Sequence, residues 1–180
     1  SMFISVHNYD VDLPAEKFAE LNAGELAGYR TAGRTHRNSY YYLRVILGCA
    51  RAVDYLRSRE DWDGRTMIVT GSSQGGALTL ITGGLCRDKV TAIAANVPAM
   101  CDHTGRYHGR PSGWPQLIPI GDPIREKIVA EQVAPYYDAV NFARHVTCPA
   151  KLGVGLIDTT CPATTVFSAY NVLSVPKQIV

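Results

Sequence analysis

The stretch that decides the fold is "TMIVTGSSQGGALTLITGG", from Thr66 to Gly84. In it, an apolar run, a serine among glycines and a helix pattern of small residues follow one another directly. This order predicts a buried strand over Met67 to Thr70, a sharp turn after it, and a helix over Ala77 to Cys86. The question it raises is whether Ser73, at the centre of the turn, is a nucleophile or only a turn residue.

Length and composition narrow the class of protein. The chain has 180 residues, 46% of them hydrophobic, which predicts one domain with a sizeable core. Its formal net charge is +2 and it has no basic block, which argues against nucleic-acid binding. No apolar run approaches the roughly 20 residues that cross a bilayer, so we expect a soluble chain without membrane partners. The native amino end is not visible, which leaves the compartment open.

The five cysteines are widely spaced and include no C-x-x-C pair. This favours buried free thiols, with one disulfide left open. The cluster of Cys101, Asp102, His103 and His108 does not fit a zinc spacing, and we interpret it as a pocket-lining loop. The sequence therefore predicts no metal and no cofactor.

Strand and helix patterns alternate along the rest of the chain. Apolar runs of the strand type stand at Met2 to Val6, Val90 to Pro98, Lys151 to Asp158 and Lys177 to Val180. A long helix is expected after a cap at Asn38 or Ser39, with an apolar stripe of Leu43, Ile46, Leu47, Ala50, Val53 and Leu56. Another helix is expected from Pro162. This alternation predicts an α/β fold whose parallel sheet is covered on both faces.

A long insert, residues 99–149, separates the third and fourth predicted strands. Its first part is rich in Gly and Pro, and residues 123–144 read as one or two helices, an excursion that often forms a lid or one wall of a pocket. The candidate substrate-pocket residues in it are His103, Tyr107 and Trp114. The aromatic side chains, with Tyr136 and Tyr137, either accept a sugar ring or anchor the packing. The "YYY" run at residues 40–42 is expected to be an interface or a packing surface and not part of the site.

The turn itself fits G-x-S-x-G, running from Gly71 to Gly75, and it lies between a strand and a helix as this motif requires. Such a turn lifts the Ser73 hydroxyl above the carboxyl edge of the sheet. The backbone N–H of Gln74 is the candidate oxyanion donor, because the helix directs its positive end at the site. The alternative is a glycine-rich phosphate cradle, which the absent Lys-Ser/Thr ending and the glycine spacing make the weaker interpretation.

A serine nucleophile needs a base and an orienting carboxylate. Asp158 ends the fourth predicted strand at the same edge as Ser73 and is the candidate acid; it could instead cap the following helix. In this fold class the chain order is Ser, acid, His. All five histidines precede Asp158: His7, His36, His103, His108 and His145. Of these, His103 could act as a substitute base from the insert, although in the wrong order.

Three segments resemble one known family. They are "RAVDYLRSREDWDGRTMIVTGSSQGGALTL", "NVPAMCDHTGR" and "GLIDTTCPATTVFSAYN". Together they resemble the acetyl xylan esterase and cephalosporin C deacetylase family of α/β-hydrolases over most of residues 51–180. The resemblance implies a three-layer sandwich with a mostly parallel sheet, with Ser73 as nucleophile, Gln74 in the oxyanion hole and Asp158 as the triad acid.

The chain departs from this family at three places. The family histidine follows the acid by several tens of residues, beyond "KQIV", and the second oxyanion donor precedes the strand that "MFISV" resembles. The family's arginine-glycine-glutamine motif reads "HNY" here, at residues 7–9. We therefore expect the middle of a longer protein, nearly inactive by itself, because losing one triad member costs about a millionfold in kcat.

The resemblance thus implies a serine esterase that removes acetyl or other small acyl groups from carbohydrate esters. Its expected ligands are small acyl esters or acetylated carbohydrates, and family analogy suggests a homo-oligomer. Two alternatives stay open. One is a catalytically inactive hydrolase-like binding domain that keeps the turn as a relic, and the other is a serine hydrolase of different specificity.

Overall fold

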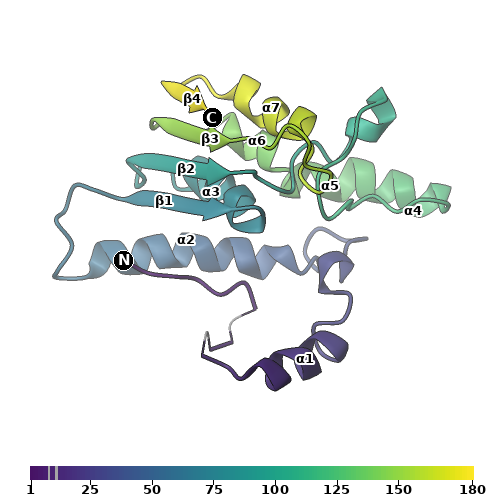
Figure 1. Cartoon of the computed structure of the whole chain (residues 1–180), viewed down its shortest axis with the longest axis horizontal. Helices are drawn as coiled ribbons and strands as arrows, with labels where there is room; N and C mark the ends of the chain where they lie inside the picture. Colours follow the sequence, from purple (N-terminus) through teal and green to yellow (C-terminus); the bar gives the residue numbers. More distant parts are fainter. Residues whose placement is uncertain (8, 11) are drawn as a thin grey trace.

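The computed structural model describes residues 1–7, 9–10 and 12–180 (Figure 1). Asn8, the middle residue of the "HNY" departure, lies outside the described residues. The elements are α1 Ala15–Ala23, η1 Tyr29–Thr31, α2 Tyr42–Ser58, β1 Ile68–Ser72, α3 Gln74–Leu85, β2 Ala92–Asn96, η2 Gly105–His108, α4 Pro123–Ile128, the π-helix η3 Val129–Val133, α5 Ala134–Tyr137, α6 Ala139–Ala143, β3 Ala150–Gly153, α7 Ala163–Val172 and β4 Lys177–Ile179.

The strands form one parallel sheet in the order β1-β2-β3-β4 within the described residues. Ser72 at the end of β1 pairs with Asn96 of β2, and Asn96 pairs with Gly153 at the end of β3. Because the pairing is parallel, the carboxyl ends of the strands meet at one edge of the sheet. Helices α4 and α5 of the insert lie beyond that edge, whereas α6 returns to the face of the sheet beside α3 (Figure 1). The predicted α/β class and parallel sheet are therefore confirmed.

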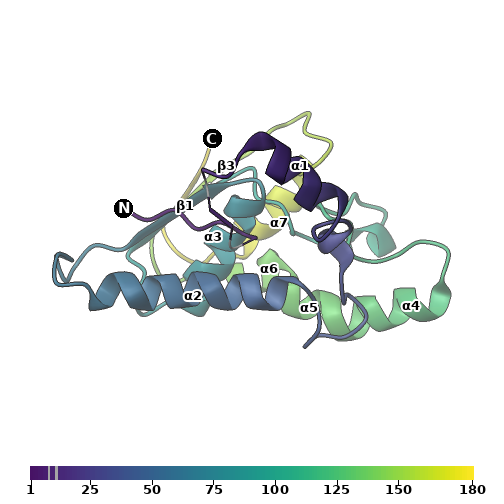
Figure 2. The same ribbon diagram turned by 90° about the horizontal axis from the view of Figure 1, so that it is seen from below.

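Helix α3 covers one face of the sheet. It packs on β1 and β2 and contacts α2 and α6, which lie on the same side of the sheet (Figure 2). Small residues allow this close approach: a Cβ on Gly83 would come within 2.9 Å of the Ile93 side chain. On the other face Ile68 is 60% exposed and Lys151 is also exposed. Within the described residues, the expected cover on both faces is thus observed on one face only.

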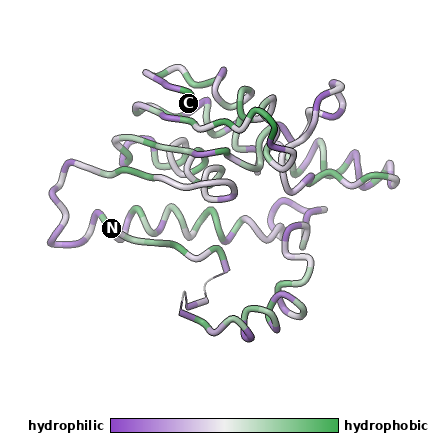
Figure 3. Tube along the Cα trace, in the orientation of Figure 1, coloured by the Kyte–Doolittle hydropathy of each residue, from purple (hydrophilic) through white to green (hydrophobic). Residues whose placement is uncertain are grey.

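The predicted strand at Met2 to Val6 is wrong. These residues have no regular secondary structure, and Phe3 is 91% exposed. The segment is as apolar as the sequence suggested (Figure 3). Apolarity alone does not make a strand, however, because a strand exists only through hydrogen bonds to a partner. Among the described residues this segment has no partner in the sheet.

The predicted cap of the long helix is also wrong. Helix α2 begins at Tyr42, and its N-cap Tyr41 makes no side-chain capping hydrogen bond. The buried stripe of α2 is rotated from the expected one, and Leu47 is exposed: Tyr42, Val45, Ile46, Cys49, Ala52 and Val53 are buried. Two buried phenols lie at the start of this stripe: the rings of Tyr40 and Tyr42 are fully enclosed and tilted against each other, with 5.4 Å between their centroids. The "YYY" run is a packing surface, as predicted.

Two further boundaries differ from the prediction. Helix α3 begins at Gln74, before the expected Ala77, so the serine turn leads directly into it. Strand β3 ends at Gly153, and Asp158 lies in the loop that follows instead of ending the strand. All five cysteines are buried and free, so the disulfide that the sequence left open does not form in this structure.

Candidate active site

The backbone of Ser73 is strained. Its φ of 54° and ψ of −116° lie in a region that side-chain-bearing residues rarely adopt. The surrounding backbone holds it there: Ser73 N–H donates to the Asn96 carbonyl at 2.9 Å, and the Ser73 carbonyl accepts from Ala77 at 3.0 Å and from Ala99 at 3.0 Å. Ser73 is also the N-cap of α3, yet its hydroxyl makes no capping hydrogen bond. The hydroxyl therefore remains available at the carboxyl edge of the sheet.

Close backbone approaches explain two of the glycines around Ser73. A Cβ on Gly71 would lie 2.5 Å from the Gly75 backbone, and one on Gly76 would lie 2.6 Å from the Asn96 carbonyl oxygen. A Cβ on Gly75, by contrast, would meet nothing within 4 Å. The backbone of Gly75 excludes a side chain at Gly71, whereas position 75 itself has room for a Cβ.

Gln74 is the first residue of α3, so its backbone N–H has no acceptor within the helix. This N–H and the positive end of the helix can stabilise an oxyanion formed beside Ser73. The Gln74 side chain is tethered, because its Nε2 donates a hydrogen bond to the phenol oxygen of Tyr42. Burial raises the pKa of Tyr42, which keeps the phenol neutral. Sequence reasoning missed this tether, since it joins residues from two helices.

The carboxylate of Asp158 stabilises the turn that precedes α7 through hydrogen bonds to its backbone. Its Oδ1 accepts from the backbone N–H groups of Thr160 and Cys161, both at 2.8 Å. The N-cap of α7 is Pro162, so Asp158 does not cap that helix directly. Its Oδ2 has no hydrogen-bond partner among the described residues. The carboxylate is therefore fixed through one oxygen, and the other can accept a hydrogen bond from an imidazole.

The loop that carries Asp158 lies against the serine turn. The Sγ of Cys161 is 4.0 Å from the Oγ of Ser73. The same loop is attached to the insert, because Trp114 N–H donates to the Thr160 carbonyl at 3.1 Å. Burial raises the pKa of Cys161, so its thiol stays protonated. The sequence offered no signal for this contact beyond the place of Cys161 in the "DTTCPATT" segment.

The histidines lie elsewhere. Within the part of the chain that the structure describes, none hydrogen-bonds to Ser73 or Asp158. His103 is 1% exposed, and neither ring nitrogen has a hydrogen-bond partner among the described residues. Its backbone N–H donates to Asp138 at 2.8 Å. Burial lowers the pKa of His103, which favours the neutral ring.

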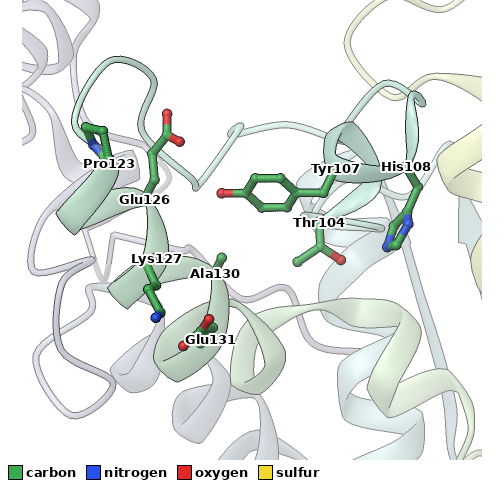
Figure 4. A pocket seen from close by; sticks show the side chains of 8 residues that line it. All are labelled: Thr104, Tyr107, His108, Pro123, Glu126, Lys127, Ala130 and Glu131. Carbon is green, nitrogen blue, oxygen red and sulfur yellow. The ribbon is translucent and has the colours of Figure 1, made fainter.

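The candidate aromatic residues do not form a single wall. Trp114 packs edge-on against Tyr42, with 6.4 Å between ring centroids. Tyr137 packs in the same manner on Tyr40, at 4.7 Å. Tyr107 stands apart from both and lines a pocket of about 560 Å³ inside the insert (Figure 4). Its lining residues are Thr104, Tyr107, His108, Pro123, Glu126, Lys127, Ala130 and Glu131.

Among the described residues, no three His, Cys, Asp or Glu side chains come together in a way that could hold a metal ion. In the same part of the chain, no helix has the length and apolarity needed to cross a membrane.

Comparison with known proteins gives consistent matches. The family model "Acetyl xylan esterase" matches residues 14–180. The acetyl esterase Axe7A of Xylanibacter ruminicola is 38% identical over 179 residues, which cover 97% of this chain and 40% of that protein. The chain thus spans well under half the length of this relative.

Solved structures agree with the sequence match. An acetyl xylan esterase from Paenibacillus sp. R4 superposes with a TM-score of 0.76 at 32% identity, over 86% of this chain and 50% of that one. Acetyl xylan esterase 1 from Thermoanaerobacterium sp. gives a TM-score of 0.71 at 23% identity, with the same coverage of 86% and 50%, a likeness of fold. The parallel sheet and its helices are of the α/β-hydrolase type.

Proposed function

The chain belongs to the acetyl xylan esterase family, and on that premise we propose that it carries the nucleophile and the acid of a serine esterase. The reaction would remove acetyl or other small acyl groups from carbohydrate esters. The observation that carries this proposal is the strained backbone of Ser73, with φ 54° at a residue whose hydroxyl caps nothing. A serine that served only as a turn residue would gain stability by relaxing or by capping α3.

In the first step, the Ser73 hydroxyl loses its proton to a base while Oγ bonds to the ester carbonyl carbon. The carbonyl oxygen then carries the negative charge, and the Gln74 N–H donates to it at the start of α3. As the intermediate collapses, the ester C–O bond breaks and the protonated base returns its proton to the departing alcohol. Water, activated by the same base, then cleaves the acyl group from Ser73 and releases acetate.

The base would be a histidine oriented by Asp158. Support comes from the Asp158 carboxylate, which uses Oδ1 for its own loop and leaves Oδ2 for an imidazole N–H. No histidine of the described residues takes this place, so we propose that a part of the protein outside this chain supplies it. The 180-residue chain alone would then hydrolyse esters very poorly, because triad members act as a unit.

The contact between Ser73 and Cys161 supports the proposal that the acyl group transferred to Ser73 is small. With the Cys161 sulfur 4.0 Å from the attacking oxygen, one side of the nucleophile is already occupied. A buried thiol there is an apolar neighbour that suits a methyl group. A long acyl chain would have to leave the site on another side.

The test is the rate of p-nitrophenyl acetate hydrolysis by this chain and by a longer form that continues past Val180. Each is compared with its Ser73→Ala variant and with Ser72→Ala, a matched control whose hydroxyl accepts from Asn96 at 3.2 Å. We expect activity only in the longer form, abolished by Ser73→Ala and kept by Ser72→Ala.

The other outcomes decide between the two alternatives. If the longer form matches its Ser73→Ala variant, the esterase proposal fails and the inactive binding domain replaces it. If butyrate and octanoate esters react faster than acetate, a serine hydrolase of different specificity replaces the acetyl esterase.

A further inference from the structure

The pocket inside the insert has no role in the chemistry described above. It lies between η2 on one side and α4 with η3 on the other, and none of its lining residues is Ser73, Gln74 or Asp158. Helix α4 lies beyond the carboxyl ends of the strands (Figure 1), at the edge of the sheet where β1 leads into Ser73. A polysaccharide whose ester group is bound at Ser73 would extend across this edge of the sheet.

Tyr107 provides an aromatic face in this pocket. The residue is 50% exposed, and the Arg106 guanidinium lies over its ring at 5.4 Å from the centroid. Because Arg106 covers one face of the Tyr107 ring, the other face is the one that a ligand could contact. Figure 4 shows the ring reaching across the pocket, with its hydroxyl directed toward the wall that carries Glu126.

The two walls are joined by Arg106. Its guanidinium forms an ion pair with Glu126 of α4 at 2.9 Å, and both side chains are about three-quarters buried, with 26% and 22% exposed. It also donates to the carbonyl oxygens of Ile118 at 3.5 Å and Pro119 at 3.2 Å. These contacts fix the distance between η2 and α4. A ligand would therefore find a formed pocket and would not have to order it, which favours binding.

The charges that line the pocket nearly cancel. Arg106 compensates the Glu126 carboxylate, which leaves the Lys127 ammonium and the Glu131 carboxylate on the same wall. This balance disfavours both a multiply charged anion and a cation. The lining still offers many hydrogen-bond donors and acceptors, including the hydroxyls of Thr104 and Tyr107. The ligand that fits this chemistry is neutral and rich in hydroxyl groups, with an apolar ring face.

We propose that this pocket is a carbohydrate subsite, in which a sugar ring stacks on Tyr107 while its hydroxyls bond to Glu126, Lys127 and Glu131. The volume of about 560 Å³ lies within the roughly 300–1,000 Å³ of small-molecule sites. The choice of a xylan-type sugar rests on the proposed function. The subsite would hold part of the polymer away from the bond that is cleaved.

The test is binding of unacetylated xylotetraose to the 180-residue chain, measured by calorimetry and by saturation-transfer NMR. This sugar has no ester, so the measurement does not depend on catalysis. Tyr107→Ala is expected to weaken binding about tenfold through loss of the stacking face. The matched control is Tyr55→Ala on α2, which removes a ring that is 53% exposed and carries the Arg59 guanidinium 5.9 Å from its centroid. That variant should bind as the wild type does.

Circular dichroism spectra of both variants would be compared with that of the wild type to check that they are folded. Equal binding by folded Tyr107→Ala, or no binding by the wild type, would overturn the subsite. Binding of inorganic phosphate in place of xylotetraose would also overturn it, since a neutral ligand is required. Because the assay is independent of hydrolysis, the two proposals can fail separately. Sugar binding by this chain together with an inactive longer form contradicts the esterase alone, and an active longer form together with no sugar binding contradicts the subsite alone.

Discussion

The Oγ of Ser73 lies 4.0 Å from the Sγ of Cys161, which joins two loops that follow non-adjacent strands. Ser73 follows β1 and Cys161 follows β3, with β2 between them. The N–H of Cys161 in turn donates to Asp158 at 2.8 Å. One residue therefore connects the proposed nucleophile to the proposed acid, and a displacement of either loop would be transmitted to the other.

The glycines of the serine turn should differ in their tolerance of alanine. Gly71→Ala and Gly76→Ala place a Cβ 2.5 and 2.6 Å from backbone atoms, so each should lower the free energy of unfolding by about 1–3 kcal/mol. Gly75→Ala meets nothing within 4 Å and lies in the first turn of α3, so it should be neutral or stabilise by up to about 1 kcal/mol. Urea denaturation of the three variants measures this, and equal losses would contradict the packing described here.

Asp158→Asn should separate the role of the carboxylate in catalysis from its role in the loop. The Asn carbonyl can still accept from Thr160 and Cys161, but the charge that orients a histidine is gone. In the form that continues past Val180 we expect kcat to fall about 10⁴-fold while thermal stability is nearly unchanged. The control is Asp63→Asn, because Asp63 Oδ1 accepts from Arg65 and Thr66 in the same way, at 2.8 Å each. If the control loses as much activity, Asp158 has no special role.

Tyr42→Phe should affect catalysis through Gln74. The variant removes the acceptor for the Gln74 side chain, so we expect a loss of about 1 kcal/mol in unfolding free energy and, in the form that continues past Val180, a several-fold lower kcat. Tyr40→Phe is the matched control. It also removes a buried phenol hydroxyl, one that donates to the Arg30 carbonyl at 2.9 Å, and it should cost similar stability without changing kcat. Equal kcat in both variants would show that the tether does not position the oxyanion donor.

His103 should make the fold sensitive to mild acid. Burial lowers its pKa below the ordinary value of 6.5, so the unfolded chain binds a proton that the folded chain does not. Its contribution to stability is present above pH 6.5 and decreases as the pH falls below that value, by up to about 1.4 kcal/mol per pH unit. His103→Leu should flatten the curve of unfolding free energy against pH between 6.5 and 5. Parallel curves for wild type and His103→Leu would be the contrary result.

The serine turn could be predicted because its information is local. An apolar run, a G-x-S-x-G turn and a small-residue helix are neighbours in sequence, so their order already implies strand, turn and helix. The structure adds the value of φ at Ser73 and shows that Gly71 and Gly76, not Gly75, meet the backbone of their neighbours. The predicted strand at Met2 to Val6 was wrong for the opposite reason, since pairing depends on a distant partner that a local pattern does not describe.

The sequence by itself determined the α/β class, the alternation of strands and helices, and the parallel sheet. It also identified Ser73, Gln74 and Asp158 as candidate site residues. Only the tertiary structure decided which side chains meet them. Cys161 beside Ser73, Tyr42 on Gln74, and the pocket between Tyr107 and Glu126 each join segments far apart in the chain. Periodicity and turn chemistry act over a few residues, whereas such contacts depend on how whole elements pack, and packing is a property of the assembled core.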